Sequence, residues 1–226
     1  MSLLATLRER FTVVAEPERA PAMQAYMKSA TPYLGVSAAP RRAVCKEVFA
    51  GLSWKASANW QADVLALWRG ARFREERYAA LELTGLRAAR TFQRIDALPM
   101  YEEMIVTGAW WDYVDTIAGE RLLTLLRSDP VEMRAAMLAW SVDEDMWKRR
   151  SAILCQLGAK GETDTELLTA CMAPSLGSKE FFLRKAIGWA LRQYARTDAD
   201  WVRNYVAAHE SALSGLSKRE ALKHIA

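Results

Sequence analysis

Apolar residues recur at intervals of three and four along almost the whole of this chain of 226 residues. That spacing places side chains on one face of an α-helix, and no stretch shows convincingly the alternation of a half-buried β-strand. Several of the 11 glycines and 7 prolines lie in short stretches, such as residues 31–35 and 173–178, that separate the apolar segments. The sequence therefore predicts an all-α fold with about a dozen helices, in a single domain over residues 1–226.

A weak internal repeat indicates how these helices are organised. Arg77, Arg150 and Arg184 each begin an Arg-x-Ala-apolar pattern, with spacings of 150 − 77 = 73 and 184 − 150 = 34 residues. If the longer spacing holds two units, the period is about 34–37 residues, which is typical of stacked helix pairs. Such solenoids bind long ligands on a concave face. Because each match spans only a few residues, chance is an open alternative.

Composition narrows the class of protein. The net charge of +4 and the pI near 9.0 are compatible with nucleic acid binding but do not establish it. The three cysteines, Cys45, Cys155 and Cys171, are far apart and odd in number, which argues for a reducing compartment and against a zinc site. The two histidines lie near the end of the chain. We therefore expect no metal and no cofactor. We also expect no membrane span, because no run of 18 apolar residues occurs.

The segment GAWWDYVDTIAGERLL, residues 108–123, carries two tryptophans and two aspartates in a predicted helix. On a helical wheel its apolar stripe consists of Trp110, Tyr113, Val114 and Ile117. Trp111 and Asp115 are four residues apart, so they lie side by side and off that stripe. An indole beside a carboxylate outside the core indicates a ligand site. In the alternative interpretation, Trp111 packs on a neighbouring repeat and Asp115 is solvated or paired.

A misplaced cation marks the predicted helix in residues 144–158. Arg150 falls inside the apolar stripe formed by Met146, Ile153 and Leu154. Because an unpaired buried charge is costly, this arginine needs a partner. It could pair with an acid such as Asp115 or direct its guanidinium into a phosphate-binding cleft. A third possibility is an arginine whose charged end reaches solvent at the edge of a repeat.

The predicted helix in residues 178–196 has two different sides. One side is apolar, and the other carries Phe182, Lys185, Trp189, Arg192 and Arg196. Aromatic and basic side chains interleaved on one face are suited to nucleic acid, because cations contact phosphates and indoles contact bases or sugars. The alternative is that this face packs against the next helix and its cations are solvated.

Five stretches carry a resemblance to a known family: residues 25–42, 110–119, 147–160, 178–200 and 216–225. With them the chain resembles the AlkD-type DNA alkylation repair glycosylases, which are built from HEAT-like antiparallel helix pairs around a concave DNA-binding face. The family's active-site set is two tryptophans, an aspartate and an arginine. The resemblance places that set at Trp111, Asp115, Arg150 and Trp189. A family tyrosine near the first helix pair corresponds to Tyr26.

The resemblance implies a monofunctional glycosylase. Such an enzyme hydrolyses the N-glycosidic bond of cationic alkylpurines, such as N3-alkyladenine and N7-alkylguanine, in double-stranded DNA, and leaves an abasic site. The family does this without flipping the damaged base into a pocket, in contrast to most glycosylases. We expect a monomer in the bacterial cytosol or nucleoid. The resemblance also covers relatives that lack the four-residue set and bind DNA without excising bases.

Four cations are candidate contacts to the DNA backbone: Lys185, Arg192, Lys218 and Arg219. Each could also be an ordinary solvated side chain. Two other functions stay open at this stage. One is a non-catalytic repeat protein that binds damaged or branched DNA, and the other is a scaffold for protein–protein contacts. The intact set at Trp111, Asp115 and Arg150 favours the glycosylase.

Overall fold

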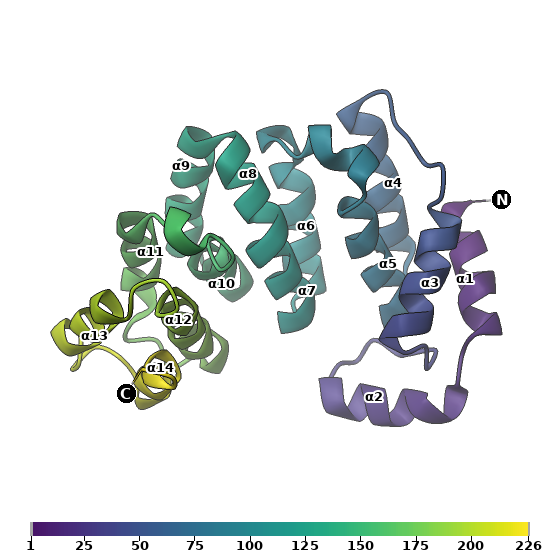
Figure 1. Cartoon of the computed structure of the whole chain (residues 1–226). Coiled ribbons are helices and arrows are strands. Elements are labelled where there is room, and N and C mark those ends of the chain that lie inside the picture. Colours follow the sequence, from purple (N-terminus) through teal and green to yellow (C-terminus); the bar gives the residue numbers. More distant parts are fainter. Residues whose placement is uncertain (1, 226) are drawn as a thin grey trace. The chain divides into compact units, whose positions relative to one another are not determined.

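The computed structural model describes residues 2–225, and every regular element in that range is a helix (Figure 1). This confirms the predicted all-α fold. The chain forms two compact units, of which the first extends to Gln93 and the second begins at Arg94. The single domain expected over residues 1–226 stays a prediction. Within the described range, none of the helices combines the length and the apolar composition that a bilayer crossing requires.

The first unit contains five α-helices and two short 3-10 turns. The helices are α1 (Leu3–Val13), α2 (Ala20–Met27), α3 (Ala38–Val48), α4 (Ser57–Gly70) and α5 (Arg74–Thr84), and the turns are Pro17–Arg19 and Arg87–Phe92. Helix α4 packs against α5, and α1 packs against α3. The fully buried Glu75 accepts hydrogen bonds from the backbone N–H groups of residues 34–36. It therefore fixes the loop that precedes α3.

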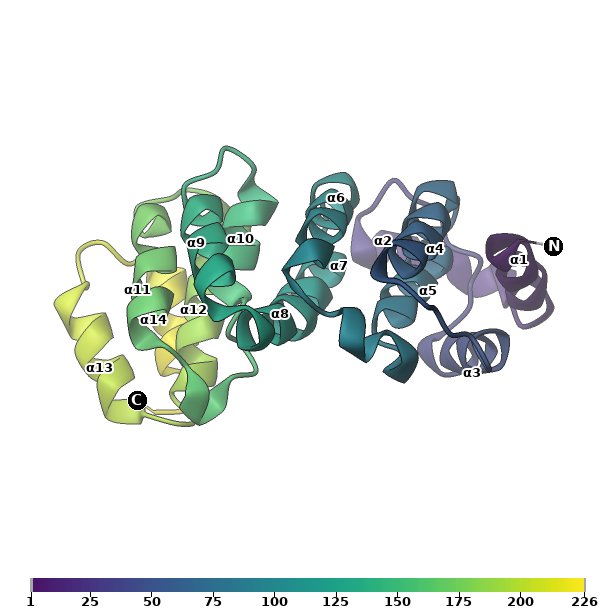
Figure 2. The ribbon, with the colours of Figure 1, turned by 90° about the horizontal axis from the view of Figure 1, so that it is seen from above.

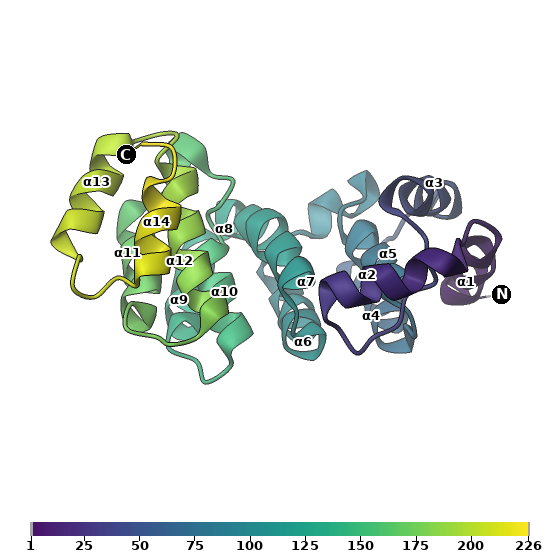
Figure 3. The same ribbon diagram turned by 90° about the horizontal axis from the view of Figure 1, so that it is seen from below.

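The second unit contains the remaining helices of the described chain. They are α6 (Leu98–Gly108), α7 (Trp111–Thr116), α8 (Leu123–Ser128), α9 (Pro130–Ser141), α10 (Met146–Leu154), α11 (Thr165–Met172), α12 (Phe181–Tyr194), α13 (Ala199–Ala208) and α14 (Gly215–Leu222), with 3-10 turns at Ile95–Ala97, Lys160–Glu162 and Ala173–Ser175 and a π-helical turn at Ile117–Leu122. Helices α10, α12 and α14 lie side by side, and α7 packs against α10 (Figure 3). Helix α9 lies beside α10 (Figure 2). The helices of this unit therefore alternate between two layers.

Ion pairs join successive helix pairs of this unit at a constant interval. Four of them connect residues 35 positions apart: Arg94 with Asp129, Asp115 with Arg150, Arg127 with Glu162, and Lys185 with Glu220. Lys185 also follows Arg150 by 185 − 150 = 35 residues. The four residues of two of these pairs, Asp115, Arg150, Lys185 and Glu220, therefore occupy equivalent positions in four consecutive repeats. This interval agrees with the period of 34–37 residues predicted from the sequence.

Most residues of the predicted apolar stripes are buried in the core, although Trp110 and Met146 are only half-buried. Tyr113, Val114 and Ile117 are fully buried, and so are Leu183, Ile187 and Leu191 of α12. Residues 108–123 do not form one uniform helix, however. The π-helical turn at Ile117–Leu122 interrupts the segment directly after α7. A π-helical turn inserts an extra residue into the helical ladder, and such turns are frequent at functional sites.

Candidate active site

A tight connection between two helices places Trp111 and Asp115. Helix α6 ends at Gly108, the next residue, Ala109, has a left-handed φ of 41°, and the extended Trp110 then leads into α7. Non-glycine residues in the left-handed region cost about 1 kcal/mol or more, so the surrounding packing must stabilise this turn. Trp111 is the first residue of α7 and Asp115 follows one turn later, both half-buried. The structure therefore confirms that the two side chains share one face of the helix.

Arg150 holds Asp115 through a bidentate ion pair. Its Nε donates to Oδ1 of Asp115 at 2.7 Å and its Nη2 donates to Oδ2 at 2.8 Å. Its Nη1 donates to the backbone carbonyl of Phe182 at the start of α12. The side chain of Arg150 is 3% exposed and that of Asp115 is 12% exposed. Arg150 therefore connects three helices and fixes both carboxylate oxygens of Asp115.

Burial raises the pKa of the Asp115 carboxyl above its ordinary value, because the charged form loses hydration there. The hydrogen bonds and the charge of Arg150 lower the pKa, and the nearby Asp112 raises it. The net direction is upward, so desolvation together with the charge of Asp112 exceeds the effect of the ion pair on the pKa. The carboxylate is consequently a stronger base than an exposed aspartate.

A cluster of aromatic side chains supports the ion pair. The ring of Phe182 lies 4.9 Å from that of Trp147 and 5.8 Å from that of Trp110, centroid to centroid. The guanidinium carbon of Arg150 lies 5.8 Å from the Phe182 ring centroid. Trp110 and Trp111 thus have different environments, although they are adjacent in sequence. Trp110 packs among the aromatic side chains that surround Arg150, whereas Trp111 shares the face of Asp115.

Asp115 and Trp189 line one open groove of about 370 Å³. The other residues in its lining are Thr116, Gly119, Glu120, Leu157, Gly158 and Gln193. Gly119 lies in the π-helical turn, and a Cβ on Gly158 would lie 3.5 Å from its carbonyl oxygen. The two backbones therefore approach closely beneath the groove. Trp111 does not belong to this lining and is next to Asp115 only through its position on α7.

The four cations predicted to contact the DNA backbone differ in whether they already have partners within the protein. Lys185 donates to Oε1 of Glu220 at 2.7 Å, and Arg192 pairs with the other oxygen of the same carboxylate. The hydrogen bond from Lys185 lowers the pKa of Glu220 below its ordinary value. Lys218 donates to the backbone carbonyl of Glu210 at 3.2 Å. Glu220 thus already partners two of the four candidate cations.

Two further candidates are more accessible. Arg219 is exposed on α14. Tyr26 belongs to the first unit, where it is 78% exposed and lines a pocket together with Tyr33 and Tyr78. The roles of all these residues in DNA binding stay predictions.

The sequence patterns missed three features of the site. They did not indicate the Phe182 carbonyl as a partner of Arg150, Glu220 as the partner of two cations, or Gln193 in the groove. A signal for Glu220 was available, because it lies 35 residues after Lys185 just as Arg150 lies 35 after Asp115. The carbonyl carried no such signal, since its direction depends on how α12 packs against α10.

Comparisons with other proteins concern the sequence and the fold of the whole chain. The sequence model of a family described as "DNA alkylation repair enzyme" matches residues 7–225. The fold is similar to a solved structure described as "Predicted DNA alkylation repair enzyme from Enterococcus faecalis". The two chains are 28% identical, their TM-score is 0.84, and the match covers 94% of this chain and 97% of the other. No curated protein matches the chain.

Proposed function

Since the chain belongs to the family of DNA alkylation repair enzymes, we propose that it is a monofunctional DNA glycosylase that excises cationic alkylpurines. N3-alkyladenine and N7-alkylguanine in double-stranded DNA are the proposed substrates, and an abasic site is the product. One observation carries the proposal. The Asp115 carboxylate is fixed by Arg150 at the edge of an open groove whose lining includes Trp189.

A fixed carboxylate suits the chemistry of N-glycosidic hydrolysis. As the bond between sugar and base breaks, positive charge develops on the deoxyribose ring. A carboxylate held in place stabilises that charge without having to reorganise. The raised pKa of Asp115 also makes it a better acceptor for the proton of the attacking water. Asp115 is therefore the proposed catalytic residue, with Arg150 as its positioning residue.

The tryptophans have a supporting role. An indole face stabilises a nearby cation by roughly 0.5–2 kcal/mol, which corresponds to about 2- to 30-fold in rate if it acts only in the transition state. Trp111 and Trp189 would provide this contact to the damaged nucleotide. Because an alkylated purine already carries a positive charge, it leaves without protonation by a general acid. One carboxylate is then sufficient, and neutral lesions are expected to react poorly.

The burial of Arg150 favours a positioning role over contact with a phosphate. Its guanidinium donates three hydrogen bonds within the protein, two to Asp115 and one to the Phe182 carbonyl. With a side chain only 3% exposed, it presents almost no surface to a DNA backbone. Phosphate contacts should therefore come from other cations.

Release of free base from DNA tests the proposal. The purified protein is incubated with a duplex containing a single 7-methylguanine, and free 7-methylguanine is quantified beside duplex binding. Binding together with base release supports the glycosylase. Tight binding without release would contradict it and indicate a non-catalytic protein that binds damaged DNA. An absence of duplex binding would contradict both DNA-binding functions and favour a scaffold for protein–protein contacts.

A further inference from the structure

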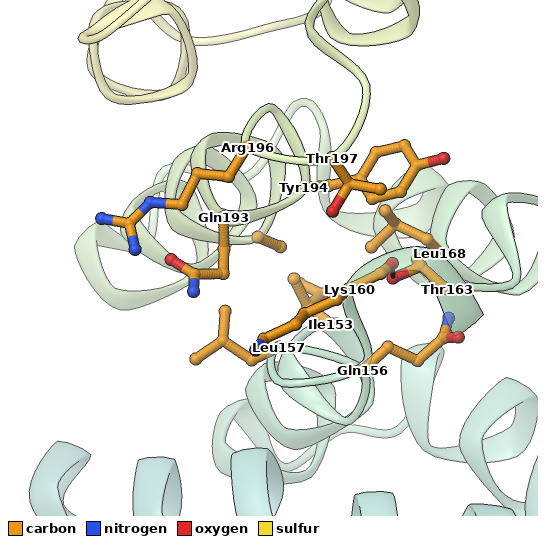
Figure 4. Close-up of a pocket in the computed structure, with 11 residues that line it drawn as sticks. Ile153, Gln156, Leu157, Lys160, Thr163, Leu168, Gln193, Tyr194, Arg196 and Thr197 are labelled. Atoms are coloured by element: carbon orange, nitrogen blue, oxygen red, sulfur yellow. Dashed lines mark hydrogen bonds between the residues drawn. The ribbon is translucent and has the colours of Figure 1, made fainter.

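A second cavity adjoins the groove of Asp115. It has a volume of about 240 Å³ and lies among α10, α11 and α12 (Figure 4). Leu157 and Gln193 line both this cavity and the groove. A ligand in the cavity would therefore lie directly beside whatever occupies the groove.

Two cations at the cavity have no acidic partner. Among residues 2–225, no carboxylate forms an ion pair with Lys160 or Arg196, and both side chains are exposed. By contrast, Arg150, Lys185 and Arg192 each pair with an acid. Lys160 and Arg196 therefore keep their charges available for a ligand.

The acids near these two cations have other partners. Glu162 pairs with Arg127, and Asp164 pairs with Arg134. Asp198 accepts a hydrogen bond from the backbone N–H of Trp201 and so caps α13. The unpaired state of Lys160 and Arg196 thus follows from how the surrounding acids are engaged, and the cavity keeps a local excess of positive charge.

The remaining lining adds hydrogen-bonding groups and apolar side chains. Gln193 and Thr197 line the cavity together with the apolar Ile153 and Leu168, and in Figure 4 the Gln193 amide points to the side on which Arg196 lies. Figure 4 shows the Lys160 side chain crossing the cavity toward Leu157 and Gln193, with the Arg196 guanidinium on the same side of the view. Lys160 has a left-handed φ of 54°, which is uncommon for a residue other than glycine.

We propose that Lys160, Gln193 and Arg196 form a phosphate subsite, which holds one backbone phosphodiester of the damaged strand beside Asp115. A planar guanidinium, an ammonium and an amide N–H group together satisfy the oxygens of a single phosphate. The subsite would fix the register of the strand, because phosphate contacts position DNA without reading its sequence. This inference rests on the proposed function and adds to it the residues that align the damaged nucleotide with the carboxylate.

Binding experiments with locally neutralised DNA test the subsite. A set of duplexes contains one 7-methylguanine and, in each, one phosphate near the lesion replaced by a neutral methylphosphonate. For the wild type, we expect one replacement to weaken binding by about tenfold, the loss of one charge-assisted contact. In the double variant Lys160→Met/Arg196→Met, that replacement should have no further effect.

The salt dependence of DNA binding provides a second test of the subsite. The slope of log K against log salt should decrease in magnitude by about 0.9 in the double variant, because one phosphate contact is lost. Arg203→Met is the matched control, since it removes an exposed cation that pairs with Asp200 on α13. It should keep the wild-type slope and the wild-type sensitivity to every methylphosphonate. Thermal melting confirms that each variant is folded.

The double variant overturns the subsite if it shows the same slope and the same sensitivity to methylphosphonates as the wild type. Base release from the same duplexes separates this outcome from failure of the proposed function. The expected binding pattern without base release would keep the subsite and contradict the glycosylase. Base release without that binding pattern would support the glycosylase and contradict the subsite.

Discussion

The ion pair between Arg150 and Asp115 makes a specific prediction about stability. Replacing Arg150 with Met keeps a long flexible side chain in the space but removes the charge. Breaking a buried ion pair by removing one partner typically costs about 3–5 kcal/mol. The carboxylate of Asp115 is 12% exposed at the groove, so water can partly replace the lost partner. We therefore expect a cost near the lower limit, about 3 kcal/mol at pH 7.

A double-mutant cycle isolates the interaction from other effects of the substitution. The four proteins are the wild type, Arg150→Met, Asp115→Asn and the double variant, each unfolded by urea at pH 7. Because Asp115→Asn removes the charge that Arg150→Met leaves unpaired, the double variant should be more stable than the sum of the single effects implies. The expected coupling energy is about 2–3 kcal/mol, which lies in the upper part of the range for residues in direct contact.

The pH dependence of the Arg150→Met variant provides an independent check. Burial already raises the pKa of Asp115, and the variant removes the cation that lowers it. The folded carboxyl then binds its proton more tightly than the unfolded one, so stability rises as the pH falls through the folded pKa toward the ordinary pKa of an aspartate. The free energy of unfolding of the variant should therefore approach that of the wild type as the pH is lowered from 7 toward that ordinary value. The reasoning would be refuted if the effects of the two single substitutions on the free energy of unfolding added within about 0.5 kcal/mol and the pH profile of stability of Arg150→Met matched that of the wild type.

Three further predictions concern other parts of the site. Trp111→Ala and Trp189→Ala should each slow base release by about 2- to 30-fold in single-turnover assays, and a loss above a thousandfold would contradict a supporting role. Glu220→Gln should release the two cations of α12 for DNA, so duplex affinity should rise and its salt slope should steepen, whereas an unchanged slope would show that they do not reach phosphate. Gly188→Ala should lower the free energy of urea unfolding by about 1–3 kcal/mol, because the added Cβ would lie 2.5 Å from the Cβ of Glu220 and 2.9 Å from the Ser217 carbonyl oxygen. If this variant were as stable as the wild type, the close approach of α12 and α14 would be excluded.

Much of the fold and the centre of the site followed from helical spacing. Trp111 and Asp115 fell off the apolar stripe of their helix, and Arg150 fell inside one, so each was out of place for a simple core. The structure joins Asp115 with Arg150 in one ion pair and places Trp189 in the groove that Asp115 lines. Such misplaced polar residues are informative because burying them without a partner is costly.

Other features depend on tertiary packing and leave no local trace in the sequence. The π-helical turn at Ile117–Leu122 follows the same apolar spacing as an α-helix, so the pattern predicted an uninterrupted helix. Whether a cation such as Lys185 is free or paired is decided by a side chain 35 residues away. The unpaired state of Lys160 likewise depends on the arginine that engages Glu162.

The most direct test of the central claim compares the wild type with Asp115→Asn on a duplex containing 7-methylguanine. Asp112→Asn is the matched control, because it removes a neighbouring acid from the same helix. Single-turnover base release by Asp115→Asn should be slower by at least about a hundredfold, the usual effect of losing a main electrostatic stabiliser, while duplex affinity stays within a few fold. Asp112→Asn should release base at close to the wild-type rate. If Asp115→Asn retained most of the wild-type rate, the carboxylate would not be the catalytic group and the account would be wrong.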